Sequence, residues 1–127
     1  MLMNDDVLFF FDQHREALPL YEAFADRVTK EIENVRIKVQ KSQISFYNKH
    51  LFACVSFAKI RKKKDCPAVY IVVTFGLDHK LDSPRIEVAA EPYPGRWTHH
   101  LILADEGELD GELMLWIKEA AAFSNRK

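Results

Sequence analysis

Hydrophobic positions near the start of the chain recur with the period of an α-helix. Over residues 16–33 the apolar side chains fall on one continuous helical face. This face contains Leu20, Tyr21, Phe24, Val28 and Ile32. Pro19 fits the first turn of the helix, where a missing backbone N–H costs little. A shorter helix is predicted before it, capped by Asn4 or Asp5 and ending near Phe11.

An alternation of period two begins at residue 35. The stretch VRIKVQ, residues 35–40, places Val35, Ile37 and Val39 on one face of a strand and polar side chains on the other. Further strands are predicted as a pair within residues 43–57, joined by a turn at 48–50, and singly within 68–76, 85–91 and 96–103. The stretch 68–76 is dominated by apolar and β-branched residues, so it is the expected central strand, covered on both faces.

A last helix is predicted from about residue 108 to residue 124. Its apolar face consists of Leu109, Leu113, Trp116, Ile117, Ala120 and Phe123. Acidic side chains crowd its start, where the helix dipole favours negative charge. The element order and the short connections predict an α+β fold. We expect a curved antiparallel sheet of about five to six strands, with two N-terminal helices and one C-terminal helix packed on one face. One domain is expected over residues 1–127.

The composition is that of an ordinary globular protein, with 127 residues, 48% apolar and 29% charged. Cys54 and Cys66 lack the paired spacing of a structural zinc site, so no metal and no cofactor are expected. Reduced thiols and the absence of a signal-peptide pattern predict a cytoplasmic location. No apolar run reaches the roughly 18 residues of a membrane span, so no membrane partner is expected.

The net charge of −1 hides a strong asymmetry along the chain. Residues 27–64 contain eleven Lys or Arg and two acids, which gives this segment a charge of +9. The remainder contains seven basic and seventeen acidic residues, which gives −10. Charge asymmetry of this kind can mark a surface that binds a partner.

The densest basic run, KIRKKKD at residues 59–65, joins two apolar strands and is expected to be an exposed loop. Its lysines could neutralise the phosphates of a nucleic acid or another polyanion without reading sequence. The candidate contact residues are Arg36, Lys38, Lys41, Lys59, Arg61, Lys62, Lys63 and Lys64. The alternative is a solvated tip that protects sheet edges from aggregation. Aromatic residues that could stack on bases are not interleaved with the run.

The stretch EPYPGRWTHHLIL, residues 91–103, carries the second candidate site. Neighbouring strand residues point to opposite faces, so His99 and His100 cannot both bind one metal ion or one substrate atom. His99 shares the more apolar face with Trp97 and is expected to lie under the helices. A ligand pocket there would be framed by Arg85, Tyr93, Arg96, Trp97 and His99. The alternative is that His99 is a core histidine whose hydrogen bonds are satisfied.

Sequence motifs that would carry catalysis were not found. No glycine-rich phosphate loop and no GxSxG elbow occurs, and Cys54 stands among apolar neighbours that favour an inert thiol. No catalytic residue is therefore assigned, and whether the protein is an enzyme stays open.

Four motifs together resemble a family of small bacterial proteins catalogued as a domain of unknown function. They are FACVSF, YIVVTFGL, LDSPRI and EPYPGRWTHH, and the similarity covers nearly the whole chain. The resemblance implies a stand-alone cytoplasmic α+β domain. It supplies no activity, cofactor or catalytic residue.

Two functional hypotheses follow from the sequence. The first is a non-enzymatic binding module for an anionic or protein partner, contacted through the basic residues. The second is a small-molecule-binding or hydrolytic domain with a pocket near Trp97 and His99. A homodimer formed through a sheet edge is a further expectation.

Overall fold

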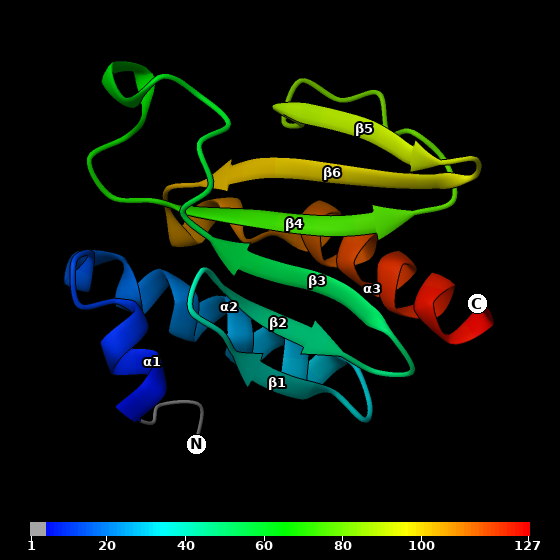
Figure 1. Ribbon diagram of the computed structural model, residues 1–127, viewed down its shortest axis with the longest axis horizontal. Helices are drawn as coiled ribbons and strands as arrows, with labels where there is room; N and C mark the ends of the chain where they lie inside the picture. The colour runs from blue at the N-terminus through cyan, green and yellow to red at the C-terminus, as the bar shows by residue number, and fades with distance from the viewer. Residues whose placement is uncertain (1–4) are drawn as a thin grey trace.

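A six-stranded antiparallel sheet organises the computed structural model, which describes residues 5–127 (Figure 1). The strands are β1 (Arg36–Val39), β2 (Gln43–Tyr47), β3 (Leu51–Ser56), β4 (Ile71–Leu77), β5 (Val88–Tyr93) and β6 (Arg96–Leu103), in the spatial order β1-β2-β3-β4-β6-β5. The α-helices are α1 (Asp5–Phe10), α2 (Leu18–Glu31) and α3 (Gly111–Arg126). Short 3₁₀ helices are η1 (Arg15–Ala17), η2 (Lys63–Asp65) and η3 (Glu106–Glu108). The predicted α+β class is confirmed.

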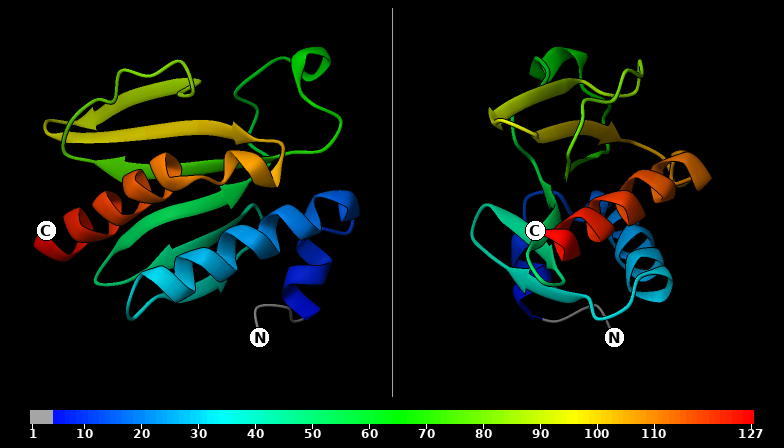
Figure 2. Two further views of the ribbon diagram at one scale, coloured as in Figure 1. Left: turned by 180° about the vertical axis from the view of Figure 1, so that it is seen from behind. Right: turned by 90° about the vertical axis from the view of Figure 1, so that its right-hand side faces the viewer.

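Helices α2 and α3 lie on the same face of the sheet, and α1 lies beside the edge strand β1 (Figures 1 and 2). The core fills the space between α2, α3 and the sheet. Phe24 of α2 meets Phe46 of β2 edge to face, with ring centroids 5.5 Å apart. Trp116 of α3 stacks on Phe75 of β4, with centroids 6.1 Å apart. Each of these aromatic pairs joins a helix to the sheet.

Strand β4 occupies the middle of the sheet because β6, not β5, is its second neighbour. The connection between β4 and β5 carries the chain to the far edge, and β5 then pairs with β6 as a hairpin. The hairpin turns at Gly95, whose φ of 74° lies in the region that favours glycine. Val72 is fully buried although it points away from the helices, as the apolar character of this strand predicted.

Element boundaries differ from the predicted ones where local turn chemistry intervenes. The helix predicted at 16–33 divides into η1 and α2 and ends before Asn34, whose φ is 59°. The last helix begins at Gly111, since the Asp110 carboxylate accepts a hydrogen bond of 3.0 Å from the Leu113 amide and caps it. The strand predicted at 85–91 begins only at Val88. The candidate cap Asn4 lies outside the described residues.

Candidate functional site

The basic run lies on the connection between β3 and β4, residues 57–70, which we call the lysine loop. In Figure 1 this loop projects past the ends of β4 and β6 and carries η2 at its tip. Four of its side chains, Lys59, Lys62, Lys63 and Lys64, belong to exposed residues. None of the four makes an ion pair with an acid among residues 5–127. Their charge is therefore available to a partner.

Arg61 has a different role, because it holds the lysine loop in place. Its guanidinium forms an ion pair with Glu87 and donates a hydrogen bond of 3.1 Å to the Asp65 carbonyl. The Cys66 thiol donates to the Lys62 carbonyl at 3.5 Å. These contacts give the loop a defined shape and leave Arg61 occupied within the protein.

Two other basic residues of the predicted polyanion surface lie elsewhere, whereas Lys41 lines the same cavity as Phe57 and Ala58 at the start of the lysine loop. Arg36 and Lys38 are on β1, at one edge of the sheet, whereas the lysine loop lies beyond β4 in every view (Figures 1 and 2). Arg36 also donates a hydrogen bond of 2.6 Å to the Asn48 carbonyl. The structure thus divides the predicted set of residues between two separate places.

Three of the five predicted pocket residues come together at the C-terminal end of α3. Tyr93, Arg96 and Trp97 line a cavity of about 230 Å³ together with Phe123 and Lys127. The Arg96 guanidinium lies 5.7 Å from the centroid of the Phe123 ring. This small recess has aromatic and cationic walls, but His99 and Arg85 do not line it.

His99 is fully buried and stacks on Phe75, with ring centroids 5.2 Å apart. Its Nε2 accepts a hydrogen bond of 3.0 Å from the Leu81 amide, so the ring is neutral with its proton on Nδ1. Nδ1 itself has no well-formed hydrogen bond to the described residues. Burial lowers the pKa of His99, and the nearby backbone of Phe75 offsets only part of this effect.

His100 faces the other side of the sheet, in a different environment. Its Nδ1 lies 2.8 Å from the Thr74 hydroxyl on β4, and burial lowers the pKa of His100. The two adjacent histidines thus belong to different sites.

Arg85 braces the start of α3. Its Nη1 lies 2.9 Å from the Asp110 carboxylate and 3.0 Å from that of Glu112, and its Nη2 donates to the Glu108 carbonyl at 2.6 Å. The guanidinium also lies 5.7 Å from the Trp116 ring centroid. These bonds fix the segment before β5 to α3, so Arg85 is engaged in structural contacts.

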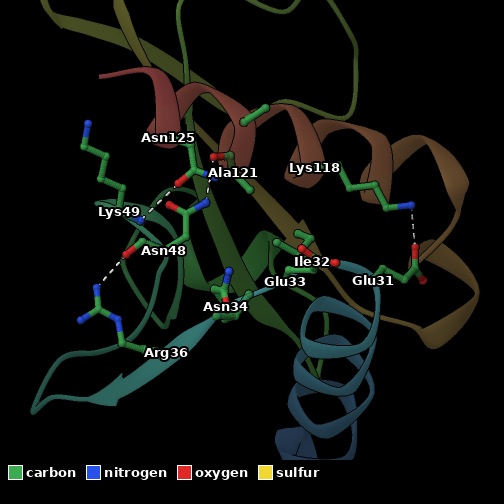
Figure 3. Close-up of a pocket in the computed structure, with 12 residues that line it drawn as sticks. Glu31, Ile32, Glu33, Asn34, Arg36, Asn48, Lys49, Lys118, Ala121 and Asn125 are labelled. Atoms are coloured by element: carbon green, nitrogen blue, oxygen red, sulfur yellow. Dashed lines mark hydrogen bonds and ion pairs between the residues drawn. The ribbon is translucent and has the colours of Figure 1, made fainter.

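A further cavity, about 810 Å³, lies where the chain leaves α2, where β2 turns into β3, and along the C-terminal half of α3 (Figure 3). We call it the helix-end cavity. Its lining includes Glu31, Glu33, Asn34, Arg36, Asn48, Lys49, Lys118 and Asn125. The pattern of the sequence gave no signal for it, because its walls come from three segments far apart in the chain.

Hydrogen bonds hold the walls of the helix-end cavity together. Asn48 donates through Nδ2 to the Ala121 carbonyl at 2.8 Å, which joins the β2–β3 turn to α3. The Glu31 carboxylate accepts from Lys118 and from Arg27, each at 2.8 Å. Lys118 first, and then Arg27, lower the pKa of Glu31. Glu33 and Lys49 add one exposed charge of each sign to the lining.

Over residues 5–127 no three His, Cys, Asp or Glu side chains gather in a group that could hold a metal ion. No helix in this range is both long and apolar enough to cross a membrane.

The fold and these surfaces define an α+β domain with an exposed basic loop and a polar cavity at its opposite end. The chain belongs to the family described as a domain of unknown function, DUF5655, which matches residues 9–124. It matches no curated protein and no solved structure.

Proposed function

We propose that the protein is a binding module for an anionic partner, which it contacts through the lysine loop. The observation that carries this proposal is that the four exposed lysines of the loop are not paired with acids among residues 5–127. Each is free of ion pairs with the described residues, whereas Arg61 and the backbone of the loop are held by contacts to Glu87 and Asp65. A loop of fixed shape with unpaired cations binds an anion with less loss of conformational entropy than a mobile one.

The test is salt-dependent binding to three probes: heparin, a labelled single-stranded DNA and a labelled RNA. If four lysines each neutralise one phosphate of a single strand, affinity should fall roughly fifty-fold between about 50 and about 200 mM salt. The double substitution Lys62→Glu and Lys64→Glu should weaken binding and reduce this salt dependence. The matched control is Lys30→Glu with Lys80→Glu, which changes the net charge equally at positions outside the loop. If none of the three probes binds in a salt-dependent way, this function is excluded.

A second candidate function is the binding of a small anionic molecule in the helix-end cavity. Its volume of about 810 Å³ lies within the usual range of ligand pockets, and its lining includes Arg36, Lys49 and Lys118. Thermal unfolding in the presence of inorganic phosphate, citrate and nucleoside monophosphates would test it. We expect at least one of these anions to raise the melting temperature.

A bulky side chain in the helix-end cavity provides the control. Ala122 lines the cavity and is exposed, so Ala122→Trp should block the ligand without disturbing the core. Leu115 lies on the same helix, 57% exposed and outside the cavity lining, so Leu115→Trp should leave the ligand effect intact. Equal stabilisation of both variants by the anion would contradict a site in this cavity.

A further inference from the structure

An aromatic cluster stands at the base of the lysine loop, with Phe57 at its centre. The His14 ring stacks on Phe57 at a centroid distance of 4.0 Å and an interplanar angle of 20°. Phe10 stacks on the same ring at 5.9 Å, and Tyr70, at the other end of the loop, meets it edge on at 6.0 Å. These residues come from α1, from the α1–α2 connection and from both ends of the loop, so only the fold brings them together.

Two cavities open against these rings, and together we call them the ring recess. One, of about 310 Å³, is lined by Asp6, Phe9, Phe10, Val39, Gln40 and Lys41. The other, of about 490 Å³, lies between α1, the β1–β2 turn and the start of the lysine loop, and Phe10, His14, Lys41, Gln43, Phe57 and Ala58 are in its lining. The cavities share Phe10 and Lys41. Phe9 is 82% exposed at the edge of the first cavity.

The ring recess also offers polar atoms that the protein does not use. The Ser45 hydroxyl donates to Gln40 Oε1 at 2.6 Å and accepts from Gln43 Nε2 at 2.8 Å. Gln40 Nε2 and Gln43 Oε1 make no hydrogen bond to the described residues, which leaves the two N–H donors of Gln40 and the carbonyl acceptor of Gln43 for a ligand. A nucleobase edge carries donors and acceptors of the same kind.

Positive charge adjoins the ring recess on the side of the lysine loop. Ala58 is part of the lining, and Lys59 is the next residue in the chain. Lys41 lies between the two cavities without an ion pair among the described residues. Among the described residues that line the two cavities, Asp6 is the only acid. Flat rings that can receive bases therefore lie beside cations that can neutralise phosphates.

We propose that the anionic partner is a single-stranded nucleic acid, whose bases enter the ring recess while its backbone follows the lysine loop. This inference rests on the function proposed above and specifies its ligand. Stacking of bases on aromatic rings, combined with a basic surface, is how proteins bind single strands without sequence preference. A duplex keeps its base faces stacked inside and cannot place them against Phe9, Phe10 or His14. A polyanion without bases would use the lysines alone.

The experiment compares four labelled probes by fluorescence anisotropy: oligo-dT of fifteen nucleotides, an abasic strand of equal length and charge, a duplex of equal length, and poly-glutamate. We expect oligo-dT to bind most tightly, with the abasic strand weaker by roughly fivefold or more, because each stacked base contributes about 1–3 kcal/mol. Equal affinity for oligo-dT and the abasic strand would overturn the base-binding proposal, as would tighter binding of the duplex or of poly-glutamate. Failure of every polyanion to bind would instead refute the proposed function itself.

Two substitutions and one control test whether the bases bind in the ring recess. Phe9→Ala removes an exposed ring that the core does not need and should weaken oligo-dT binding roughly fivefold, while heparin binding stays unchanged. Tyr93→Ala is the matched control, since Tyr93 is 70% exposed at a different place in the fold and should have no effect. Asp6→Asn removes the single acid of the recess and should strengthen oligo-dT binding. If Phe9→Ala leaves oligo-dT binding unchanged, or weakens heparin binding equally, the ring recess is not the base site.

Discussion

Acidification from pH 7.5 to pH 5.5 is expected to destabilise the protein through His99. The imidazole is fully buried, and its Nε2 accepts a hydrogen bond from the Leu81 amide. A proton on Nε2 would break this bond and place a charge in the core. The pKa of His99 in the folded protein therefore lies below the ordinary histidine value. The unfolded chain keeps the ordinary pKa and binds the proton first, so the free energy of unfolding falls as the pH drops.

The size of this effect follows from proton linkage. With an unfolded pKa of about 6.5 and a lowered folded pKa, one histidine lowers the free energy of unfolding by at most about 1.4 kcal/mol between pH 7.5 and pH 5.5. The effect is absent well above pH 6.5 and stops growing below the folded pKa. His100 acts in the same direction, since its pKa is also lowered by burial, but its ring is only partly buried. The carboxyl groups whose pKa is lowered, Glu31, Asp78 and Asp110, titrate below this window.

Urea unfolding at pH 7.5, 6.5 and 5.5 measures the effect, with His99→Gln as the informative variant. Glutamine does not titrate, and its side-chain oxygen can still accept a hydrogen bond from Leu81. We expect this variant to lose most of the His99 contribution to the pH dependence. His99→Leu also removes the titration, but it leaves the Leu81 amide unpaired and should cost a further 1–3 kcal/mol or so at pH 7.5.

The change in the free energy of unfolding with pH tests whether His99 is held neutral in the folded protein. If wild type and His99→Gln lose the same free energy of unfolding between pH 7.5 and pH 5.5, His99 is not held neutral by its surroundings. His100→Gln serves as the comparison, because it removes the neighbouring histidine without touching the core stack on Phe75.

Three further predictions concern the fold and the lysine loop. Phe24→Ala, which removes a fully buried ring packed on Phe46, should lower the free energy of unfolding by about 3–5 kcal/mol in urea. At Asn34, where φ is 59°, glycine should be tolerated, whereas Asn34→Val should cost about 1–2 kcal/mol; equal stabilities would show that the turn adopts another conformation. Arg61→Ala removes the contacts to Glu87 and Asp65 and should speed tryptic cleavage at Lys62–Lys64, whereas Arg15→Ala, which removes an exposed ion pair, should not.

Periodicity predicted the elements well because most of them bury one regular face. The helical face that includes Leu20, Phe24 and Val28 is buried as expected, and the apolar run 68–76 became the central strand. Boundaries were less predictable, since they depend on single contacts such as the cap by Asp110 on Leu113. The strand order was not predictable from the pattern, because a β4–β5 connection of ten residues can lead either to a neighbouring strand or to the edge.

The candidate sites were less predictable than the elements, because they depend on contacts between distant segments. The sequence shows no aromatic residue within the basic run, yet the fold places His14 4.0 Å from Phe57 at its base. Arg85 and Arg96 were grouped by their nearness in the chain, and the structure assigns them to opposite ends of α3. Only the alternation along β6, which separates His99 from His100, could be read directly from neighbouring residues.

The charges of this protein explain why a net charge of −1 is a poor guide to its partners. Several acids are paired with groups of the protein itself at its surface: Asp110 caps α3 and pairs with Arg85, Glu31 binds Arg27 and Lys118, and Glu87 pairs with Arg61. The four lysines of the lysine loop have no such partners among the described residues. At ordinary salt an unpaired charge influences other charges only within about 10 Å. A partner that binds at the loop therefore responds to these lysines and not to the net charge of the whole protein. Two variants of equal net charge, one altered inside the loop and one outside it, should therefore bind an anion differently.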